Sequence, residues 1–365
     1  MLGIAASAFE DGTSGMSDQI AEKKSRKVPV IIVLGMLALC LAAFGTLWWL
    51  DSAPSGMAAS TVVVVHKGES FRDIARNLKR LGLIKSALLL DGYSVLTHTA
   101  SALQVGRYSI DKGSSTIAIH DMLVSGRQIL VRVTIPEGWT LRQIAARLEA
   151  QKITTASAFL DAAGSAPLLK ALHIPLRSAQ GFLFPDTYLF PEGYPADKVV
   201  RTMAADFFKN LSEIYPEYAS LPPSDLAAKV TMASVVEGEY RVPDEAPVIA
   251  SVFYNRLAAN IRLESCATVS YVLTDIEGKP HQTRLYDKDL WVSSPYNTYR
   301  HRGLPPGPIS EPGRTALHAA FYPAKTNFLY FVLENPVSGK HFFSESYSAH
   351  ELAKYEYVNL YLKQN

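Results

Sequence analysis

A run of 23 uncharged, mostly apolar residues near the N-terminus, Val28 to Leu50, constrains this chain more than any other feature. As a helix that rises about 1.5 Å per residue, the run is long enough to cross the roughly 30 Å hydrocarbon core of a bilayer. No polar face interrupts it, so a helix buried in a soluble core is the weaker interpretation. The run therefore predicts a single transmembrane helix over residues 28–50.

The residues on either side of this run predict its orientation. Four basic residues lie within residues 23–27, whereas Asp51 is the only charged residue between the run and Lys67. Basic flanks stay in the cytoplasm, so we expect residues 1–27 to form a cytoplasmic tail and the rest of the chain to lie outside. The alternative is a cleaved signal peptide, although its apolar region would be unusually long. Residues 51–60 are small, with Pro and Gly among them, and predict a linker.

Charge, cysteines and histidines exclude several classes of protein. A formal net charge of +2 over 365 residues predicts no nucleic-acid partner. Two cysteines, one of them inside the apolar run, are too few for a disulfide framework. The nine histidines show no metal-ligand spacing and no Gly-rich phosphate loop occurs, so we expect neither a metal nor a cofactor.

An internal repeat follows the linker. Gly68–Leu78 (GESFRDIARNL) and Gly138–Leu148 (GWTLRQIAARL) match at six positions, 70 residues apart. A β-branched stretch precedes each copy, at Thr61–Val65 and Ile129–Ile135, so each copy predicts a strand, a turn and a Ser/Thr-capped amphipathic helix. The first copy resembles the LysM module, which binds amino-sugar glycans; a purely structural role is the alternative.

One later helix carries the candidate catalytic residue. Ser224 follows two prolines and is predicted to cap this helix, on which Leu226, Val230 and Glu237 fall along one stripe. The stripe is apolar until Glu237, which leaves two interpretations. Either the helix leaves the core and the carboxylate is solvated, or it faces an apolar cleft, where desolvation raises its pKa as a general acid needs. Glu239 lies about 200° around the helix and cannot share that face.

Aromatic, Pro and Gly residues are frequent in the second half of the chain. A rigid Pro/Gly loop that carries Tyr and Asn is suited to holding a sugar, and a packed connector is the alternative. Six segments stand out in order: Gln180–Tyr188 (QGFLFPDTY), Val252–Leu257 (VFYNRL), Tyr296–Tyr299 (YNTY), Gly303–Ile309 (GLPPGPI), His318–Pro323 (HAAFYP) and Tyr330–Val332 (YFV). Together with Ala233–Glu239 (ASVVEGE), they resemble the endolytic murein transglycosylases of the MltG (YceG-like) family.

The resemblance covers about 300 residues and implies a bacterial lytic transglycosylase. Such an enzyme cleaves the MurNAc–GlcNAc β-1,4 bond within peptidoglycan strands, leaves 1,6-anhydroMurNAc ends and terminates the growing strand. We expect it in the cytoplasmic (inner) membrane as a single-pass protein, with its catalytic domain in the periplasm or outside the cell. Its expected partners are peptidoglycan glycan strands, the membrane and, as candidates, peptidoglycan synthases.

The expected fold is α+β, with a transmembrane helix, a LysM-like α/β module and a mixed α+β catalytic domain. The module is expected over residues 61–134, a second strand–turn–helix repeat with a connector over 135–176, and the catalytic domain over 177–365. Near the C-terminus we expect a strand buried on both faces at Phe328–Leu333, a second strand at His341–Ser344 and a helix at Glu351–Leu362. His341 and His350 match family positions, and we interpret both as structural.

The family's catalytic glutamate falls on Glu237. When protonated it would donate to the glycosidic oxygen, and the resulting carboxylate would take the proton from the MurNAc O6 hydroxyl. Two residues depart from the pattern: Gln180 stands where members commonly have Glu, and Cys266-Ala267 where many have Asp-Pro. The residues predicted to contact or position the sugar are Glu239, Asn255, Arg256, Tyr296, Asn297, Thr298, Tyr299, Asp186 and Tyr188.

Two other functions remain open at this point. A hydrolytic muramidase needs a second carboxylate, for which Asp186, Glu239, Asp244 and Glu264 are the candidates. A membrane-anchored peptidoglycan-binding scaffold without catalysis would use the same LysM-like module.

Overall fold

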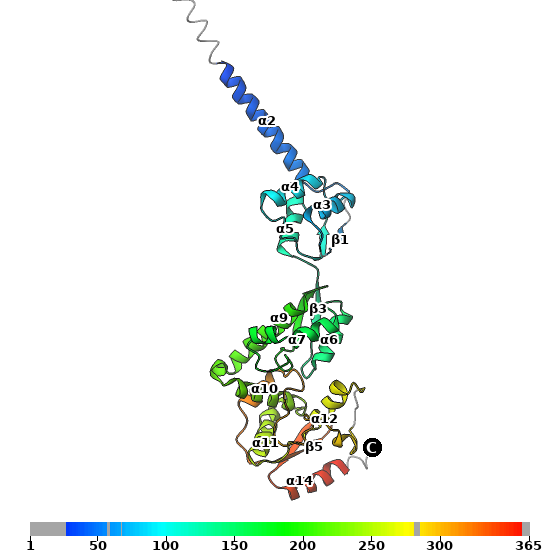
Figure 1. Cartoon of the computed structure of the whole chain (residues 1–365), viewed down its shortest axis with the longest axis vertical. Coiled ribbons are helices and arrows are strands. Elements are labelled where there is room, and N and C mark those ends of the chain that lie inside the picture. Colours follow the sequence, from blue (N-terminus) through cyan, green and yellow to red (C-terminus); the bar gives the residue numbers. More distant parts are fainter. Residues whose placement is uncertain (1–26, 57–58, 67, 281–284, 360–365) are drawn as a thin grey trace, which may run out of the picture. The chain divides into compact units, whose positions relative to one another are not determined.

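A computed structural model describes residues 27–56, 59–66, 68–280 and 285–359 (Figure 1). The chain divides into two compact units, with the boundary between Gln128 and Ile129. This boundary is earlier than the expected one at residue 134. The reason is that the strand Leu130–Thr134 pairs with Thr187–Pro191, far along the chain, and so belongs to the second unit. Helices and short strand pairs are mixed in both units, which confirms the α+β class.

The first unit begins with a long apolar helix, α2 (Lys27–Asp51). Its side chains are exposed from Val30 to Trp49, and the stretch Val30–Asp51 is long and apolar enough to cross a membrane. A membrane anchor and a signal sequence both have such a helix. The helix matches the predicted span at residues 28–50.

The rest of the first unit is built on one antiparallel strand pair, in which Val63 lies opposite Tyr108. Helix α3 starts at a capping box, in which Ser70 accepts from the Asp73 amide and the Asp73 carboxylate accepts from the Ser70 amide. Its core-facing residues include Ile74. The elements are β1 (Ser60–Val65), α3 (Phe71–Arg80), α4 (Ala87–Leu96), β2 (Gly106–Asp111) and α5 (Thr116–Ser125).

The end of α2 is bonded to this strand–helix unit. Asp51 accepts a hydrogen bond from the Ile117 amide at 2.8 Å, at the start of α5. Lys85 donates to the Trp49 carbonyl at 3.0 Å and to the Ser52 hydroxyl at 2.7 Å. The expected linker at residues 51–60 therefore begins with residues that are held by the unit.

The second unit opens with the second copy of the repeat. β3 (Leu130–Thr134) and β4 (Thr187–Pro191) are antiparallel, as β1 and β2 are. Helix α6 (Leu141–Ala150) again starts at a capping box, made here by Thr140 and Gln143. In both copies a strand precedes a Ser/Thr-capped helix, which confirms the predicted pattern. Each copy also has further helix and a returning strand, which were not predicted. Two short helices follow α6, namely α7 (Ala156–Ala163) and α8 (Ala166–Ala171).

A layer of longer helices forms the core on which the candidate site is built. Helix α10 (Pro223–Glu237) packs against α13 (Arg314–Phe321) and α11 (Ala246–Ala258), and α9 (Ala196–Ile214) packs against α13. The predicted cap of α10 was wrong by two positions. Pro222 is the N-cap, and Ser224 lies in the first turn with its hydroxyl 3.1 Å from the Asp225 carboxylate. Proline is favoured at a first helical position because its missing N–H needs no partner there.

The C-terminal part adds an antiparallel ribbon, β5 (Tyr330–Asn335) and β6 (Lys340–Ser344). Residues 330–333 are half-buried, so the prediction of a strand buried on both faces was wrong. A two-stranded ribbon has too little sheet around it to cover both faces. Helix α14 (Tyr347–Lys354) starts four residues before the prediction and continues as a π-helical turn, and residues 360–362 of the predicted helix lie outside the described residues.

Two histidines near the C-terminus have contacts within the protein. His341, in β6, has its Nδ1 atom 2.8 Å from the Glu245 carboxylate, and the His350 ring stacks on Tyr330, as expected of structural histidines.

The remaining described elements are short. They are 3₁₀ turns at Pro216–Ser220, Pro243–Glu245 and Asp289–Trp291, the helix α12 (Cys266–Tyr271), and π-helical turns at Val272–Ile276 and Tyr355–Asn359.

Candidate active site

Glu237 is the last residue of α10, and two segments from distant parts of the chain surround its carboxylate. The Gly313 amide donates to one carboxylate oxygen at 2.9 Å, and the Tyr240 hydroxyl lies 3.5 Å from the other. On the other side, a Cβ atom added to Gly138 would lie 3.6 Å from the Glu237 Cγ. Gly138 also has φ +74°, which a residue with a side chain rarely adopts. The glycine therefore permits a close approach to Glu237.

Burial makes Glu237 a weak acid. Its pKa is raised from 4.5 to about 7, mainly by desolvation and to a smaller extent by the nearby Glu137 charge. The Gly313 amide and the Tyr240 hydroxyl oppose this in part, because they donate to the ionised form. The carboxyl group therefore holds its proton in a large fraction of molecules near neutral pH. This is the second of the two interpretations that the stripe on α10 left open.

Two hollows are lined by residues next to Glu237 and next to its hydrogen-bond donor. Gly238, the next residue, lines a hollow of about 510 Å³, and Arg314, which follows the hydrogen-bond donor Gly313, lines another of about 650 Å³. Hollows beside an acid and beside the residue that holds it are suited to a chain-like substrate. The first hollow is lined mainly by Gly138, Thr140, Arg142, Ala267, Tyr271, Asp275 and Ser310. The second is lined mainly by Glu213, Pro243, Asp244, Arg314, Thr315 and His318.

The Pro/Gly-rich segment at residues 303–313 is fixed to α10 one turn before Glu237. Ser234 accepts a hydrogen bond from the Ile309 amide at 3.0 Å, and the Ser310 hydroxyl donates to the Ser234 carbonyl at 3.3 Å. Ser234 and Ser310 are both buried. Because Gly313 follows three residues later, these bonds set the position of the amide that holds Glu237.

Glu311 is a buried acid that sequence reasoning missed. Its backbone accepts from the Gly138 amide at 2.8 Å and donates to the Trp139 carbonyl at 2.7 Å. Its carboxyl group accepts from the Leu183 amide at 2.9 Å and from the Gln180 side-chain amide at 3.2 Å. Burial raises its pKa well above the ordinary value. A charged residue type within an otherwise apolar Pro/Gly loop was the available signal.

Glu239 contributes to the site indirectly, by holding the segment that precedes α12. It lies beyond the end of α10, and its carboxylate accepts from the Ser265 hydroxyl, just before α12. Burial raises its pKa, and bonds from Ser265 and the Ala267 amide lower it in part. A Cβ atom on Gly238 would lie 2.5 Å from the Ala267 Cβ, so the glycine lets this turn pack on α12. Glu239 therefore positions α12, whose residues line the first hollow.

With this geometry described, the chain can be compared with known proteins. The model of the YceG-like family matches residues 63–356, most of the chain. This chain belongs to the YceG-like family. It is 31% identical over 370 residues to a protein of Streptococcus pneumoniae serotype 2 (strain D39) named endolytic murein transglycosylase. It is 32% identical over 314 residues to a Bacillus subtilis (strain 168) protein of the same name.

These alignments differ in coverage. The chain aligns over 91% of its own length and spans 66% of the streptococcal relative, and it aligns over 81% with 84% of the Bacillus relative. A crystal structure of a YceG-like protein from Listeria monocytogenes matches 80% of this chain and 98% of that one, at 30% identity and a TM-score of 0.54. The fold therefore also matches that of a YceG-like protein.

In this YceG-like chain, two of the predicted sugar-positioning residues have their polar atoms occupied inside the protein. Asn297 is 0% exposed and donates to the Leu290 and Val292 carbonyls. The Thr298 hydroxyl accepts from the Ser265 amide at 3.0 Å and lies 2.9 Å from the Thr268 hydroxyl. These contacts hold the loop in shape. The structure thus gives both residues a structural role, and a direct sugar contact stays a prediction.

The two tyrosines of the same loop contact residues of α12. The Tyr296 ring centroid is 5.1 Å from that of Tyr271, which lines the first hollow. The Tyr299 hydroxyl lies 3.1 Å from the Cys266 sulfur, and burial raises the pKa of both groups. Tyr296 thus packs on a residue that lines the first hollow, and its contact with a sugar stays a prediction. Cys266 stands where the family resemblance implies Asp, and its sulfur contacts the Tyr299 hydroxyl.

Asn255 and Arg256, on α11, join loops together. The Asn255 amide donates to the Thr326 and Phe328 carbonyls at 2.8 and 3.0 Å. Arg256 is buried, donates to the Leu329 carbonyl at 3.1 Å and pairs with the Glu264 carboxylate, and neither α11 residue lines either hollow.

Asp186 and Tyr188 lie at β4, and neither lines either hollow. Asp186 is exposed and accepts from the Thr187 amide. Tyr188 is buried, and its hydroxyl donates to the Phe184 carbonyl at 2.7 Å and lies 3.1 Å from the Asp206 carboxylate. The structure therefore gives Tyr188 a structural role.

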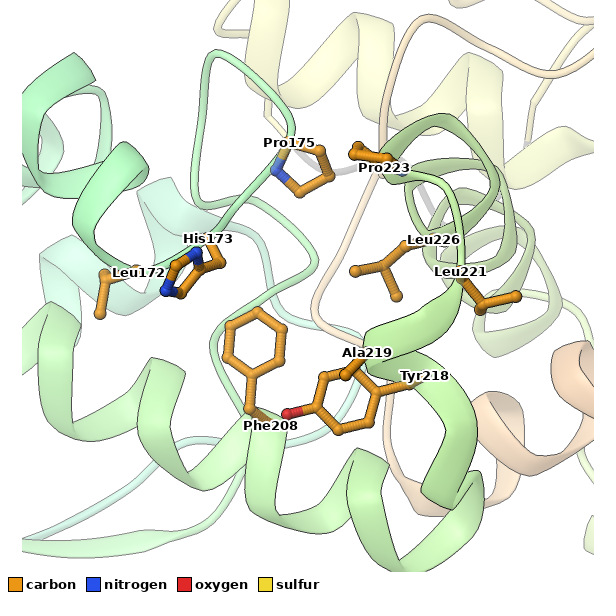
Figure 2. A pocket seen from close by; sticks show the side chains of 9 residues that line it. All are labelled: Leu172, His173, Pro175, Phe208, Tyr218, Ala219, Leu221, Pro223 and Leu226. Carbon is orange, nitrogen blue, oxygen red and sulfur yellow. The ribbon is translucent and has the colours of Figure 1, made fainter.

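A third hollow lies at the opposite end of α10 (Figure 2). Its volume is about 490 Å³, and the Phe208 and Tyr218 rings stack beside it with centroids 5.8 Å apart. Leu226 lines it, eleven residues from Glu237, which on a helix is about 16 Å. This apolar hollow is therefore separate from the candidate active site.

Proposed function

We propose that this chain is a membrane-anchored, endolytic peptidoglycan lytic transglycosylase. The observation that carries the proposal is Glu237, a half-buried glutamate whose pKa is raised to about 7 and whose neighbour Gly238 lines a hollow. Its setting in a YceG-like chain supports the substrate, because two relatives bear the name endolytic murein transglycosylase. The bond cleaved is the MurNAc–GlcNAc β-1,4 bond within a strand.

One acid is enough for this reaction. Protonated Glu237 donates to the glycosidic oxygen, and GlcNAc leaves with its O4 hydroxyl while positive charge develops at MurNAc C1. The Glu237 carboxylate then removes the proton from the MurNAc O6 hydroxyl, and O6 bonds to C1 to close the 1,6-anhydro ring. Because the O6 hydroxyl belongs to the same sugar, it competes well against water. A pKa near 7 suits a group that acts first as acid and then as base.

Hydrogen bonds already present would stabilise the intermediate state of Glu237. The Gly313 amide and the Tyr240 hydroxyl point at the two carboxylate oxygens. After proton donation the negative charge on Glu237 meets these donors at once, without rearrangement. They also orient the carboxylate for its second role.

The other parts of the proposal concern location and partners. Helix α2 supports anchoring in the bacterial cytoplasmic membrane, with residues 1–27 inside and the chain that follows α2 outside. The β1–α3–α4–β2 arrangement supports a LysM-like glycan-binding module within the first unit. Cleavage of glycan strands at the outer side of the membrane would terminate nascent strands. Peptidoglycan synthases are the candidate protein partners.

The test is mass spectrometry of glycan strands digested by the wild type and by Glu237→Gln. We expect 1,6-anhydroMurNAc ends from the wild type and a loss of several orders of magnitude in the variant, with binding retained. Hydrolytic products would be about 18 Da heavier, since water is added. Their appearance, together with inactivity of Asp244→Asn, would favour a muramidase, because Asp244 lines the second hollow. A wild type that binds strands but releases no fragments would be a scaffold.

A further inference from the structure

Helix α4 of the first unit has an apolar face that no described residue covers. Leu88 is 83% exposed, Val95 61% and Leu96 76%. At about 100° per residue these side chains lie on one side of the helix, whereas Leu90 and Ser94 are buried on the other. Large apolar side chains gathered on one helix face indicate a binding surface rather than a random exposure.

This face is continuous with the last turns of α2. A hollow of about 680 Å³ is lined by Phe44, Leu47 and Trp48 from α2 and by Leu88 and Leu96 from α4, with few polar atoms. Figure 1 shows α4 beside the end of α2. One apolar surface thus runs from the membrane-spanning helix onto the unit that follows it.

The contact between α2 and the unit is held by specific bonds. Asp51 accepts from the Ile117 amide at the start of α5, and Lys85, just before α4, donates to the Trp49 carbonyl. The Lys85 ammonium also lies 4.7 Å from the centroid of the Trp49 ring. These bonds join the end of α2 to the residue just before α4 and to the start of α5. The position of α4 along the axis of α2 is therefore set by the fold.

The position of α4 along the α2 axis corresponds to the membrane interface. The 23 uncharged residues Val28–Leu50 span about 34 Å as a helix, slightly more than the roughly 30 Å hydrocarbon core. Trp48 and Trp49 then lie at the headgroup level, where tryptophan is favoured. Leu88 and Leu96 share a hollow with residues 44–51, so they lie within the depth of the last two turns of α2.

We propose that α4 is an interfacial helix, whose apolar face inserts between lipid headgroups and the upper acyl chains of the outer leaflet. The occupant of the hollow is lipid, because lipid already surrounds the α2 side chains that form half of it. The proposal rests on the proposed anchoring by α2. Its consequence is that the LysM-like module lies against the membrane and binds glycan at a fixed height above it.

The test uses the full chain in vesicles of phosphatidylethanolamine and phosphatidylglycerol. In a Cys40→Ser, Cys266→Ser background, a single cysteine at Leu96 carries a fluorophore that bromines high on the lipid acyl chains quench. The reference position is Leu47 in α2, and the matched control is Val64, another exposed apolar residue of the first unit, on β1. We expect quenching at Leu96 close to that at Leu47 and several-fold stronger than at Val64.

Quenching at Leu96 no stronger than at Val64, with strong quenching at Leu47, would overturn the proposal and leave the anchor intact. Weak quenching at Leu47 as well would refute the anchor itself, and α4 insertion with it. A second variant tests whether the apolar face drives insertion. With the fluorophore at Leu88, the substitution Leu96→Glu is expected to reduce quenching several-fold, and unchanged quenching would contradict the proposal.

Discussion

The replacement Glu237→Gln is expected to stabilise the protein at neutral and alkaline pH while it abolishes activity. Glutamine has the shape of the protonated acid and still accepts from the Gly313 amide. It carries no charge at any pH, so it removes the cost of burying a carboxylate. Removal of a catalytic group that is held in an unfavourable environment commonly exchanges function for stability.

The magnitude follows from the pKa of Glu237, which is 4.5 in an exposed state and about 7 in the fold. Between these values the folded state binds more protons than the unfolded state, so wild-type stability falls as pH rises. Each pH unit costs about 1.4 kcal/mol, which gives about 3 kcal/mol in total above pH 7. We expect the free energy of unfolding of the variant to exceed that of the wild type by about 2–3 kcal/mol above pH 7, because the Glu237 side chain is partly exposed.

The assay is denaturant and thermal unfolding of the full chain in detergent across pH 4 to 8. The variant should match the wild type near pH 4 and exceed its Tm by about 4–12 °C near pH 8, at roughly 2–4 °C per kcal/mol for a unit of this size. Glu217→Gln, at an exposed glutamate of the same unit, controls for the loss of one charge. A stability difference independent of pH would refute the reasoning, since Glu237 would then have an ordinary pKa.

Three further predictions follow from the contacts around the site. Glu137→Gln removes a negative charge that raises the pKa of Glu237, so the alkaline limb of the kcat/KM profile should move to lower pH, with the maximal rate little changed. Glu239→Ala removes the carboxylate that holds the start of α12, and unfolding experiments should show a loss of about 1–3 kcal/mol. Gln180→Glu and Glu311→Gln should each destabilise the protein by about 1–3 kcal/mol, whereas the double exchange should recover most of the loss in a double-mutant cycle.

The elements of this fold that depend on neighbouring residues were predictable from the sequence. The two capping boxes follow from a Ser or Thr three residues before Asp73 and Gln143. The apolar stripe on α10 placed Glu237 on a core-facing side, because helical periodicity alone determines which residues share a face. The family resemblance then selected the catalytic interpretation.

Contacts between distant segments could not be predicted in the same way. Gly138 and Gly313 approach Glu237 from 99 residues before and 76 residues after it, and no local pattern reports such a meeting. Residue type was also an incomplete guide in the Tyr-Asn-Thr-Tyr loop. An amide or hydroxyl serves a sugar and a backbone carbonyl equally well, and Asn297 uses its amide for two carbonyls of its own loop.

The pair formed by Gln180 and Glu311 shows how packing accommodates a departure from the family motif. The resemblance implies Glu where this chain has Gln180, yet the Gln180 side chain donates to the Glu311 carboxylate and accepts from the Leu141 amide at 3.1 Å. A glutamate at position 180 would bring two buried carboxyl groups to about this distance, and one of them would have to stay protonated. In this chain the pair consists of one amide, Gln180, and one acid, Glu311. Because the backbone of Glu311 also fixes Gly138 beside Glu237, the pair supports the candidate catalytic side chain.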